Sequence, residues 1–409
     1  MKKTLIALAV LGTIAGVAQA QSSVTIYGIV DTGATYINKV ETGPGTTGSL
    51  LLADPGILQG SRLGFKGVED LGGGLKALFQ LETGFIASNG ALDFQSAGGT
   101  GLFNRKSVVG LGGDFGSVLL GRQTDALFDY GRWTAVQDFG MMLVGVGHAL
   151  DGQLGVRTNN SIRYDTANLS GFTANAIYGF GGTAGQSSAG QSFGLGGQYA
   201  NGPLALFAAY YQAKLGTYAN GSTAPIPGGG VASSASDSIL SLTVPIQPPQ
   251  FGGNPGDTAL KTFSIGASYQ AGPARLYGNW SRIKQPLAGL NGNGLGENSQ
   301  DFIGGLSNSK SDIFELGTDY ALTGPLHLLA SVEYDKLTFV DTATPGKLTQ
   351  FNLGLDYFLS KRTDVYAFAS YQRAQDAISL GTFVTNSPLN APSGETNQAT
   401  VAVGIRHKF

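Results

Sequence analysis

The chain has 409 residues, of which 64 are Gly and none is Cys, and its formal net charge is −2 at pH 7. The absence of Cys excludes a disulfide framework and a lipid-bearing Cys, and 16 Tyr with 22 Phe is an aromatic content that disordered chains lack. The slightly acidic balance argues against a nucleic-acid-binding protein.

The first 20 residues have the pattern of a secretory signal. Lys2 and Lys3 give a basic start, residues 5–17 are apolar, and Ala18-Gln19-Ala20 is a small-x-small cleavage site. We therefore expect residues 1–20 to be removed on export. Residues 21–409 then form a single domain with 23 basic and 27 acidic side chains, a net charge of −4.

After the signal, apolar and polar residues alternate through almost the whole chain, which is the period of β-strands. In "LKALFQLETGF", for example, Lys76, Gln80 and Glu82 share one face and the bulky apolar residues share the other. The chain after the signal has no run of about 18 apolar residues, which a transmembrane helix would need. A closed β-barrel is the other structure that satisfies its backbone hydrogen bonds inside lipid. The polar face would lie inside such a barrel, but outside in a soluble sandwich.

The connections between the strands favour the barrel, because short turns and long loops alternate along the chain. Seven segments have turn chemistry: 70–73, 113–116, 168–171, 201–203, 271–273, 323–325 and 360–362. Eight longer connections lie between them: 38–59, 88–102, 124–157, 182–191, 215–259, 285–310, 341–347 and 375–396. Fifteen connections predict an all-β fold, a transmembrane antiparallel up-and-down barrel of 16 strands with turns on one side and loops on the other.

The last alternating segment, "VAVGIRHKF", brings its bulky side to an aromatic residue, Phe409. Chain termini are usually polar and frayed, so this pattern predicts a fixed and paired position for Phe409. Aromatic residues at outward positions of other strands suit the two interfacial girdles of a membrane barrel: Tyr27, Phe180, Tyr199, Tyr269, Tyr320, Tyr357 and Phe409.

Five segments together resemble the general porins of Gram-negative bacteria, in particular those of β-proteobacteria. They are "QSSVTIYGIVDTGATY", "SRLGFKGVEDLGGGLKALFQLETGF", "NRKSVVGLGGDFGSVLLGRQ", "NNSIRYDT" and "VAVGIRHKF". The resemblance implies an outer-membrane homotrimer in which each barrel is a water-filled pore narrowed by an inward-folded third loop. It also implies that the barrel-assembly machinery recognises Phe409 as an assembly signal, with outer-membrane lipid around the barrel.

Candidate pore-lining cations come from strand phase and from the resemblance. Arg62 opposes Leu63 and Phe65, and Arg163 opposes Ile162 and Tyr164, so both arginines are expected to face the lumen. The phase around Arg105 is ambiguous, and the resemblance places Arg105 inward. Arg122 has an unfavourable phase for the lumen, and we assign it to the pore mouth.

The third long connection supplies three candidate acids, Asp125, Asp129 and Asp138, and Asp138-Phe139-Gly140 resembles the family's acid-Phe-Gly element. Each acid could instead be solvated on a surface loop. However, the loop is more apolar than an exposed loop should be, and folding into the barrel would bury its apolar groups: Phe128, Trp133, Phe139, Met141, Met142, Leu143 and Val144. We predict that arginines on the wall and carboxylates on the loop together set ion selectivity.

Enzyme chemistry is not expected. Residues 190–194 match G-x-S-x-G, but that nucleophile motif needs a strand-to-helix elbow with acid and His partners, and here another strand follows. His148, His327 and His407 are scattered and lack metal-ligand spacing, so we expect no metal and no cofactor.

The sequence therefore predicts a general porin for passive diffusion of ions and small hydrophilic solutes. A substrate-specific porin of the same fold is an alternative if the constriction carries an aromatic track. An outer-membrane barrel hydrolase or a secreted adhesin is disfavoured, because no catalytic set converges and the strands have apolar outer faces.

Overall fold

The computed structural model describes residues 23–43, 46–92, 101–131, 138–140, 157–182, 191–214, 259–284, 310–338, 345–375, 381–384, 387–390 and 395–409. The predicted signal at 1–20 lies outside them, as do Trp133, His148 and the apolar run 141–144. Among the described residues, no helix is long and apolar enough to cross a membrane.

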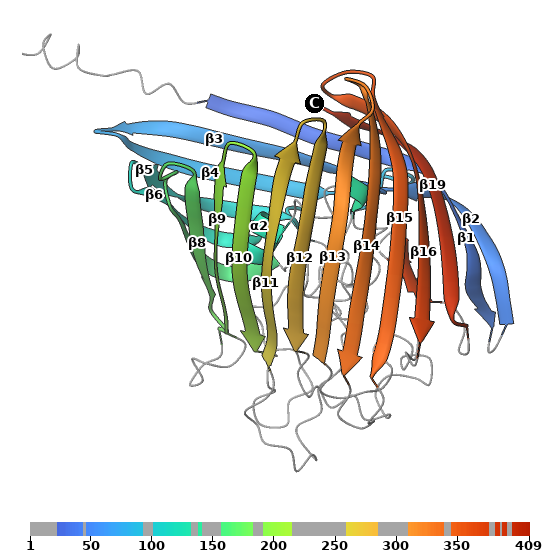
Figure 1. Ribbon diagram of the computed structural model, residues 1–409. Coiled ribbons are helices and arrows are strands. Elements are labelled where there is room, and N and C mark those ends of the chain that lie inside the picture. Colours follow the sequence, from blue (N-terminus) through green and yellow to red (C-terminus); the bar gives the residue numbers. More distant parts are fainter. Residues whose placement is uncertain are drawn as a thin grey trace, which may run out of the picture.

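The chain is built almost entirely of antiparallel strands (Figure 1). In order along the chain, the elements are β1 (Ser23–Gly43), β2 (Thr46–Pro55), β3 (Arg62–Gly72), β4 (Leu75–Gly84), β5 (Lys106–Gly113), β6 (Gly116–Thr124), α2 (Ala126–Tyr130), β7 (Arg157–Asp165), β8 (Phe172–Gly179), β9 (Ser192–Asn201), β10 (Leu204–Lys214), β11 (Ala259–Ala271), β12 (Ala274–Lys284), β13 (Lys310–Ala321), β14 (Leu326–Thr338), β15 (Gly346–Phe358), β16 (Thr363–Gln375), β17 (Gly381–Val384), β18 (Ser387–Asn390) and β19 (Asn397–Lys408). All of these strands except β17 and β18 belong to one sheet.

The sheet closes on itself, because β1 pairs with β19 on one edge and with both β2 and β3 on the other. The part of β1 from Thr32 onward pairs with β2, and the part up to Ile29 pairs with β3. These two strands therefore occupy one position in the ring, so the 17 strands of the sheet make 16 positions. This confirms the predicted 16-stranded barrel.

The first long connection differs from the prediction. Most of the segment 38–59, expected as a loop, continues β1 to Gly43 and forms β2. Ile37 and Val40 are buried against Leu50 and Leu52, and this small apolar cluster extends the hairpin. Only residues 56–61, between the end of β2 and the start of β3, are not strand in the barrel position that β2 and β3 share.

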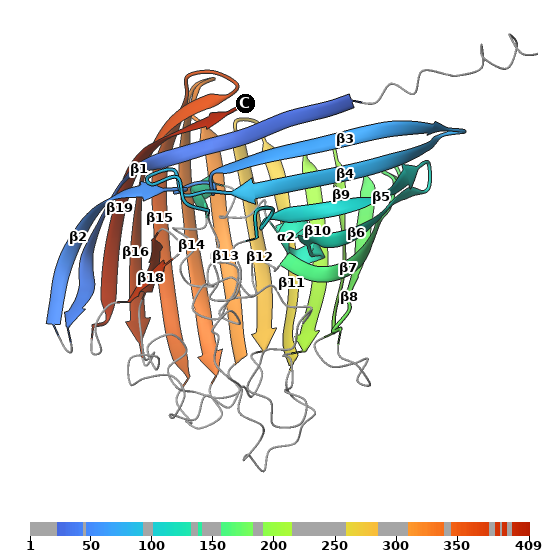
Figure 2. The ribbon, with the colours of Figure 1, turned by 180° about the vertical axis from the view of Figure 1, so that it is seen from behind.

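The seven predicted turns each join the expected pair of strands, from β3–β4 through β15–β16. They lie together at one end of the barrel in Figures 1 and 2. The outer face of the strands is apolar and the inner face polar, as expected for a barrel in lipid. On β15, for example, Leu353 on the outer face is 56% exposed, whereas Gln350 on the inner face is 0% exposed.

Phe409 occupies a fixed position on β1, next to the seam where the barrel closes. Its backbone N–H donates to the carbonyl of Gly28, and the N–H of Gly28 donates to the carbonyl of Phe409, both at 3.0 Å. A Cβ atom at Gly28 would lie 2.3 Å from Cζ of the Phe409 ring, so the ring occupies the space that only glycine leaves. The predicted paired position of Phe409 is confirmed.

Tyr27 corrects one of the outward assignments. Val24 and Ile26 are exposed on the outer face of β1, so alternation turns Tyr27 inward. Its hydroxyl donates to Oε2 of Glu82 at 2.8 Å. The other predicted girdle residues are exposed: Phe180, Tyr199, Tyr269, Tyr320, Tyr357 and Phe409.

Candidate pore constriction

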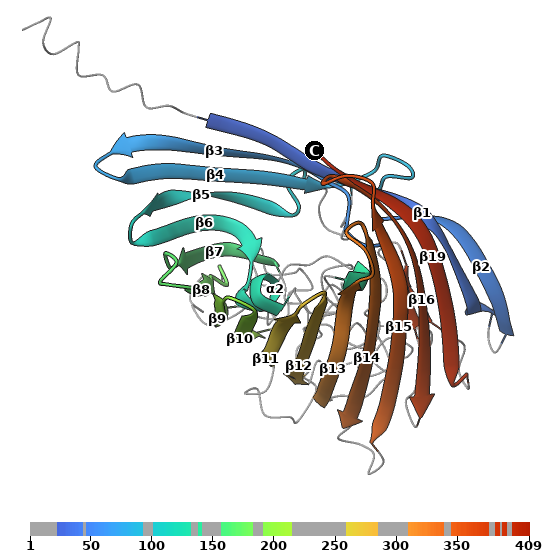
Figure 3. The ribbon, with the colours of Figure 1, turned by 45° about the horizontal axis from the view of Figure 1, so that its top comes forward.

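The third long loop begins with α2, which lies inside the ring beside β8, β9 and β10 (Figure 3). Its apolar residues Ala126, Leu127 and Tyr130 pack against the inward side chains of β10. Apolar contact with the inner wall thus directs the start of the loop into the barrel.

Asp125 is the N-cap of this helix, where its Oδ1 accepts a hydrogen bond from the backbone N–H of Phe128 at 2.9 Å. The side chain is 0% exposed. Capping satisfies a helix N–H that would otherwise lack a partner. We therefore remove Asp125 from the predicted constriction and assign it a structural role.

The loop segment 138–140 reaches the opposite wall of the barrel. Asp138 forms an ion pair with Arg275 on β12. Phe139 is fully buried, with its ring edge-on to Phe368 of β16 at 5.5 Å between centroids. Gly140 has φ of +70° and lies against the carbonyl of Leu58, where a Cβ would be 2.4 Å away. These contacts confirm that the third loop folds inward, with its two described parts packed against different sides of the inner wall.

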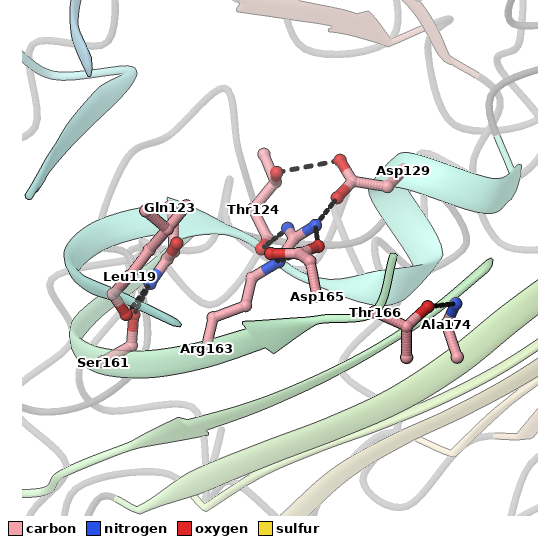
Figure 4. Close-up of polar contacts among 9 residues, drawn as sticks. All are labelled: Leu119, Gln123, Thr124, Asp129, Ser161, Arg163, Asp165, Thr166 and Ala174. Carbon is pink, nitrogen blue, oxygen red and sulfur yellow. Dashed lines mark hydrogen bonds and ion pairs between the residues drawn. The ribbon is translucent and has the colours of Figure 1, made fainter. Parts of the chain in front are cut away.

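Arg163 is the centre of a charge cluster beside α2 (Figure 4). It lies on β7, and its guanidinium contacts Oδ2 of Asp129 at 2.5 Å and both carboxylate oxygens of Asp165, with Nε at 3.0 Å from each. It also donates to the carbonyl of Thr124 at 2.8 Å, and the Thr124 hydroxyl donates to Asp129 at 3.0 Å. Arg163 on the wall and Asp129 from the loop are therefore direct partners on one side of the lumen.

Arg105 faces inward, where its Nε lies 2.7 Å from Oε1 of Glu82. The second oxygen of Glu82 accepts from Tyr27, whose hydroxyl in turn accepts from Gln80 at 2.6 Å. Arg105 immediately precedes β5, so strand alternation does not fix its direction. This position explains why its phase in the sequence was ambiguous.

Arg62 and Lys106 add two further cations to the same wall. Arg62 is the first residue of β3, donates to the carbonyl of Gly60 at 3.0 Å, and acts electrostatically on Glu82. Lys106 pairs in register with Glu82 and shares the inward phase of buried Val108. The wall at β3 to β7 thus carries inward cations and carboxylates, and α2 adds one further carboxylate, Asp129. The cations include Arg62, Arg105, Lys106 and Arg163, and the wall carboxylates are Glu82 and Asp165.

Arg122 lies at a β-bulge between β6 and β7. Its Nε donates to the carbonyl of Asn104 at 2.5 Å and its Nη1 to Oδ1 of Asn159 at 2.7 Å. The guanidinium therefore connects the loop-side ends of neighbouring strands. Its role at the pore mouth stays a prediction.

Asp138 has an unusual charge state for a carboxylate. Burial raises the pKa of its carboxyl to about 7, although the neighbouring Arg275 guanidinium lowers it. The negative charge of the loop tip thus depends on pH near neutrality.

Three participants in these ion pairs were missed at the level of sequence. Glu82 and Asp165 lie on the polar faces that the alternation identified. Asp165 is only two positions from Arg163 on the same strand, whereas pairing Glu82 with Arg105 requires the strand register. Arg275 lies 137 positions from Asp138, and no local pattern joins them.

The G-x-S-x-G match does not form a nucleophile elbow. Ser192 is the first residue of β9, is buried at the inner wall, and is followed by strand residues. Gly190 lies outside the described part. Of the histidines in that part, His327 contacts Asp319 and His407 contacts Thr363, both far from Ser192 in the ring order.

Comparisons with known proteins agree with this architecture. The family model described as Gram-negative porin matches residues 7–377. Outer membrane porin protein 32 of Delftia acidovorans is 33% identical over 423 aligned positions that cover 100% of both chains. The anion-selective porin from Comamonas acidovorans has a TM-score of 0.67 at 28% identity, covering 95% of this chain and 100% of that one. The trimer form of OmpT from Vibrio cholerae shares the fold, with a TM-score of 0.60 at 15% identity and coverage of 95% and 99%.

Proposed function

Because this chain belongs to the Gram-negative porin family, we propose that its outer-membrane channel has a mild preference for anions. The channel itself serves passive diffusion of ions and small hydrophilic solutes through the barrel lumen. The observation that carries the proposed preference is the row of inward cations on β3, β5 and β7.

The constriction in this proposal consists of Arg62, Arg105 and Arg163 on the wall, with Asp129 and Asp138 from the third loop. Charges beyond a Debye length of about 8 Å at physiological salt are largely screened, so the mature net charge of −4 matters less than these groups. Arg105 and Arg163 each have carboxylate partners at 2.5–2.7 Å. Such pairing reduces the local positive potential, and the preference is therefore mild. The anion-selective porin from Comamonas acidovorans supports the same sign.

Reversal potentials in a KCl gradient test the proposal. Arg62→Ala and Arg163→Ala should each shift the reversal potential toward cation preference, and the shift should shrink as salt rises. Arg362→Ala, in the exposed β15–β16 turn, is the matched control and should leave it unchanged. Cation preference in the parent protein, or no shift in either lumen variant, would overturn the assignment.

The proposed assembly is a homotrimer, with segment 88–102 as a latch over the neighbouring subunit. The trimer form of OmpT supports a trimeric state at the level of the fold. One closed barrel satisfies its own backbone hydrogen bonds, so association would rest on side-chain contacts. Outer-membrane lipid and the barrel-assembly machinery, acting through Phe409, complete the proposed partners.

The proposed role excludes enzyme activity. Ser192 begins strand β9 rather than a strand-to-helix turn, the described His327 and His407 contact Asp319 and Thr363, and an adhesin would not need an apolar outer face. A substrate-specific porin remains the alternative. Saturable permeation of one solute, against linear dependence on concentration for a general porin, separates the two.

A further inference from the structure

Residues 56–61, the segment between β2 and β3, are tied at both ends to one residue of β1, Asp31. At the first end, the N–H of Gly56 donates to the Asp31 carbonyl at 2.8 Å. At the second end, the Ser61 hydroxyl accepts from the Asp31 N–H at 3.0 Å and donates to the Asp31 carbonyl at 3.2 Å. The backbone of Asp31 therefore closes the segment into a small loop against β1.

The side chain of Asp31 holds the middle of the same segment. Val30 is exposed on the outer face of β1, so alternation turns Asp31 inward, where it is 0% exposed. Its Oδ2 accepts from the N–H of Leu58 at 3.1 Å and from the N–H of Gln59 at 2.8 Å. Hydrogen bonds to a carboxylate are stronger than those to a neutral acceptor. The carboxylate therefore fixes the backbone of the segment at 58–59.

Tyr366 of β16 fixes the other oxygen of this carboxylate. Its hydroxyl donates to Asp31 Oδ1 at 2.6 Å, although β19 lies between β16 and β1. Gly404 of β19 makes this reach possible. It is the register partner of Tyr366, and a Cβ there would lie 2.2 Å from the Tyr366 hydroxyl oxygen. Asp31 is therefore a junction between segment 56–61 and the strands on both sides of the barrel seam.

Segment 56–61 is also the surface on which the tip of the third loop lies. Gly140 lies against the carbonyls of Ile57 and Leu58, where a Cβ would be 2.5 and 2.4 Å away. Phe139 packs in the same cluster of buried side chains as Ile57 and Leu58. The position of the loop tip thus depends on the position of this segment.

We propose that Asp31 is a positioning residue of the pore constriction, acting through segment 56–61 on the tip of the third loop. It is fully buried and does not touch a permeating solute. The Tyr366 hydroxyl orients the carboxylate, the carboxylate fixes the segment, and the segment supports Phe139 and Gly140. This inference rests on the channel function and not on the proposed ion preference. Its test reads conductance and current noise, whereas reversal potentials read the preference, so the two can fail separately.

The rival role for Asp31 is to balance the charge of Arg406. Arg406 is the register partner of Asp31 on β19, and its guanidinium pairs with Asp364 at 3.1 Å. Asp31→Asn separates the two roles, because it removes the charge and keeps the hydrogen-bonding groups. Its amide oxygen can accept from both N–H groups of the segment, and its NH₂ group can donate to the Tyr366 hydroxyl oxygen.

Single-channel recording of the mature full-length protein tests the proposal. Asp31→Ala removes the acceptor for Leu58 and Gln59, and loss of a hydrogen bond to a charged group should raise the undocked population of the loop tip roughly 10- to 100-fold. We expect a larger mean conductance and greater current noise than in the parent. Asp31→Asn should recover most of the parent behaviour. Asp31→Ala should add little in a Phe139→Ala background, because both changes undock the same tip.

Equal effects of Asp31→Asn and Asp31→Ala would assign Asp31 to charge balance and overturn the proposal. Additive effects of Asp31→Ala and Phe139→Ala would overturn it as well. Heat-resistant mobility on gels checks that each variant is folded. If Asp31→Ala does not fold, Tyr366→Phe carries the test, because it keeps the ring and removes only the donor to Oδ1. It should raise the current noise, and parent-like noise would then overturn the proposal.

Discussion

The contact between Phe139 and the far wall should control how far the third loop narrows the lumen. Phe139 is fully buried in a cluster on the inner wall, which contains Ile57, Leu58, Tyr277, Leu329, Tyr366, Phe368 and Ala402. Replacing a buried Phe with Ala costs about 3–5 kcal/mol. Since every 1.4 kcal/mol or so is a factor of ten in an equilibrium, Phe139→Ala should raise the undocked population of the loop tip by a factor of roughly 10² to 4 × 10³.

Single-channel recording at fixed voltage measures this effect. An undocked tip no longer restricts the lumen, so we expect a larger mean conductance and greater current noise in Phe139→Ala than in the parent. Phe351→Ala is the matched control, because it removes the same ring from the lipid-facing side of β15, where the side chain is 53% exposed. Parent-like conductance and noise in Phe139→Ala would refute the claim that this contact holds the loop tip.

Three other predictions follow from charge and from the barrel seam. Lowering the pH from 8 to 6 should shift the ion selectivity of the parent toward anions, because protonation of Asp138, whose pKa is about 7, removes a negative charge beside Arg275. Asp138→Asn should lose this part of the pH dependence, and a variant with the pH profile of the parent would contradict the prediction. Gly28→Ala should reduce the yield of heat-resistant barrel, measured by gel mobility, because its Cβ would overlap the Phe409 ring. Gly101→Ala is the control, because there is open space around Gly101. Equal yields of the two variants would count against the seam contact. Deleting Phe409 should impair outer-membrane assembly while leaving export across the inner membrane intact, and normal amounts of inserted barrel would exclude an assembly role.

Strand periodicity predicted strands with one apolar and one polar face, and the alternation of short turns with long loops distinguished a barrel from a soluble sandwich. The turns and loops also gave the number of strands, and the phase of each strand gave the direction of Arg62 and Arg163. None of these sequence patterns could show that 46–55 is also strand, since that hairpin depends on burial of Ile37 and Val40 against the partner strand.

The details of the constriction depend on contacts that local sequence does not encode. Asp125 resembles Asp129 as a loop acid, and only the start of α2 distinguishes the cap from the ion-pair partner. The partners Arg105 and Glu82 are 23 positions apart, and Asp138 and Arg275 are 137 apart. Similarly, Asp31 and Tyr366 are 335 positions apart and become neighbours only through closure of the barrel at β1 and β19.

Recording from the purified parent protein in a planar bilayer tests the central claim most directly. We expect discrete conductance steps that scale with salt, and a reversal potential in a KCl gradient with the sign of an anion-preferring channel. Absence of conductance steps from correctly folded barrels would contradict the assignment as an open diffusion channel, and a reversal potential of the opposite sign would contradict the role given to the arginines of β3 to β7.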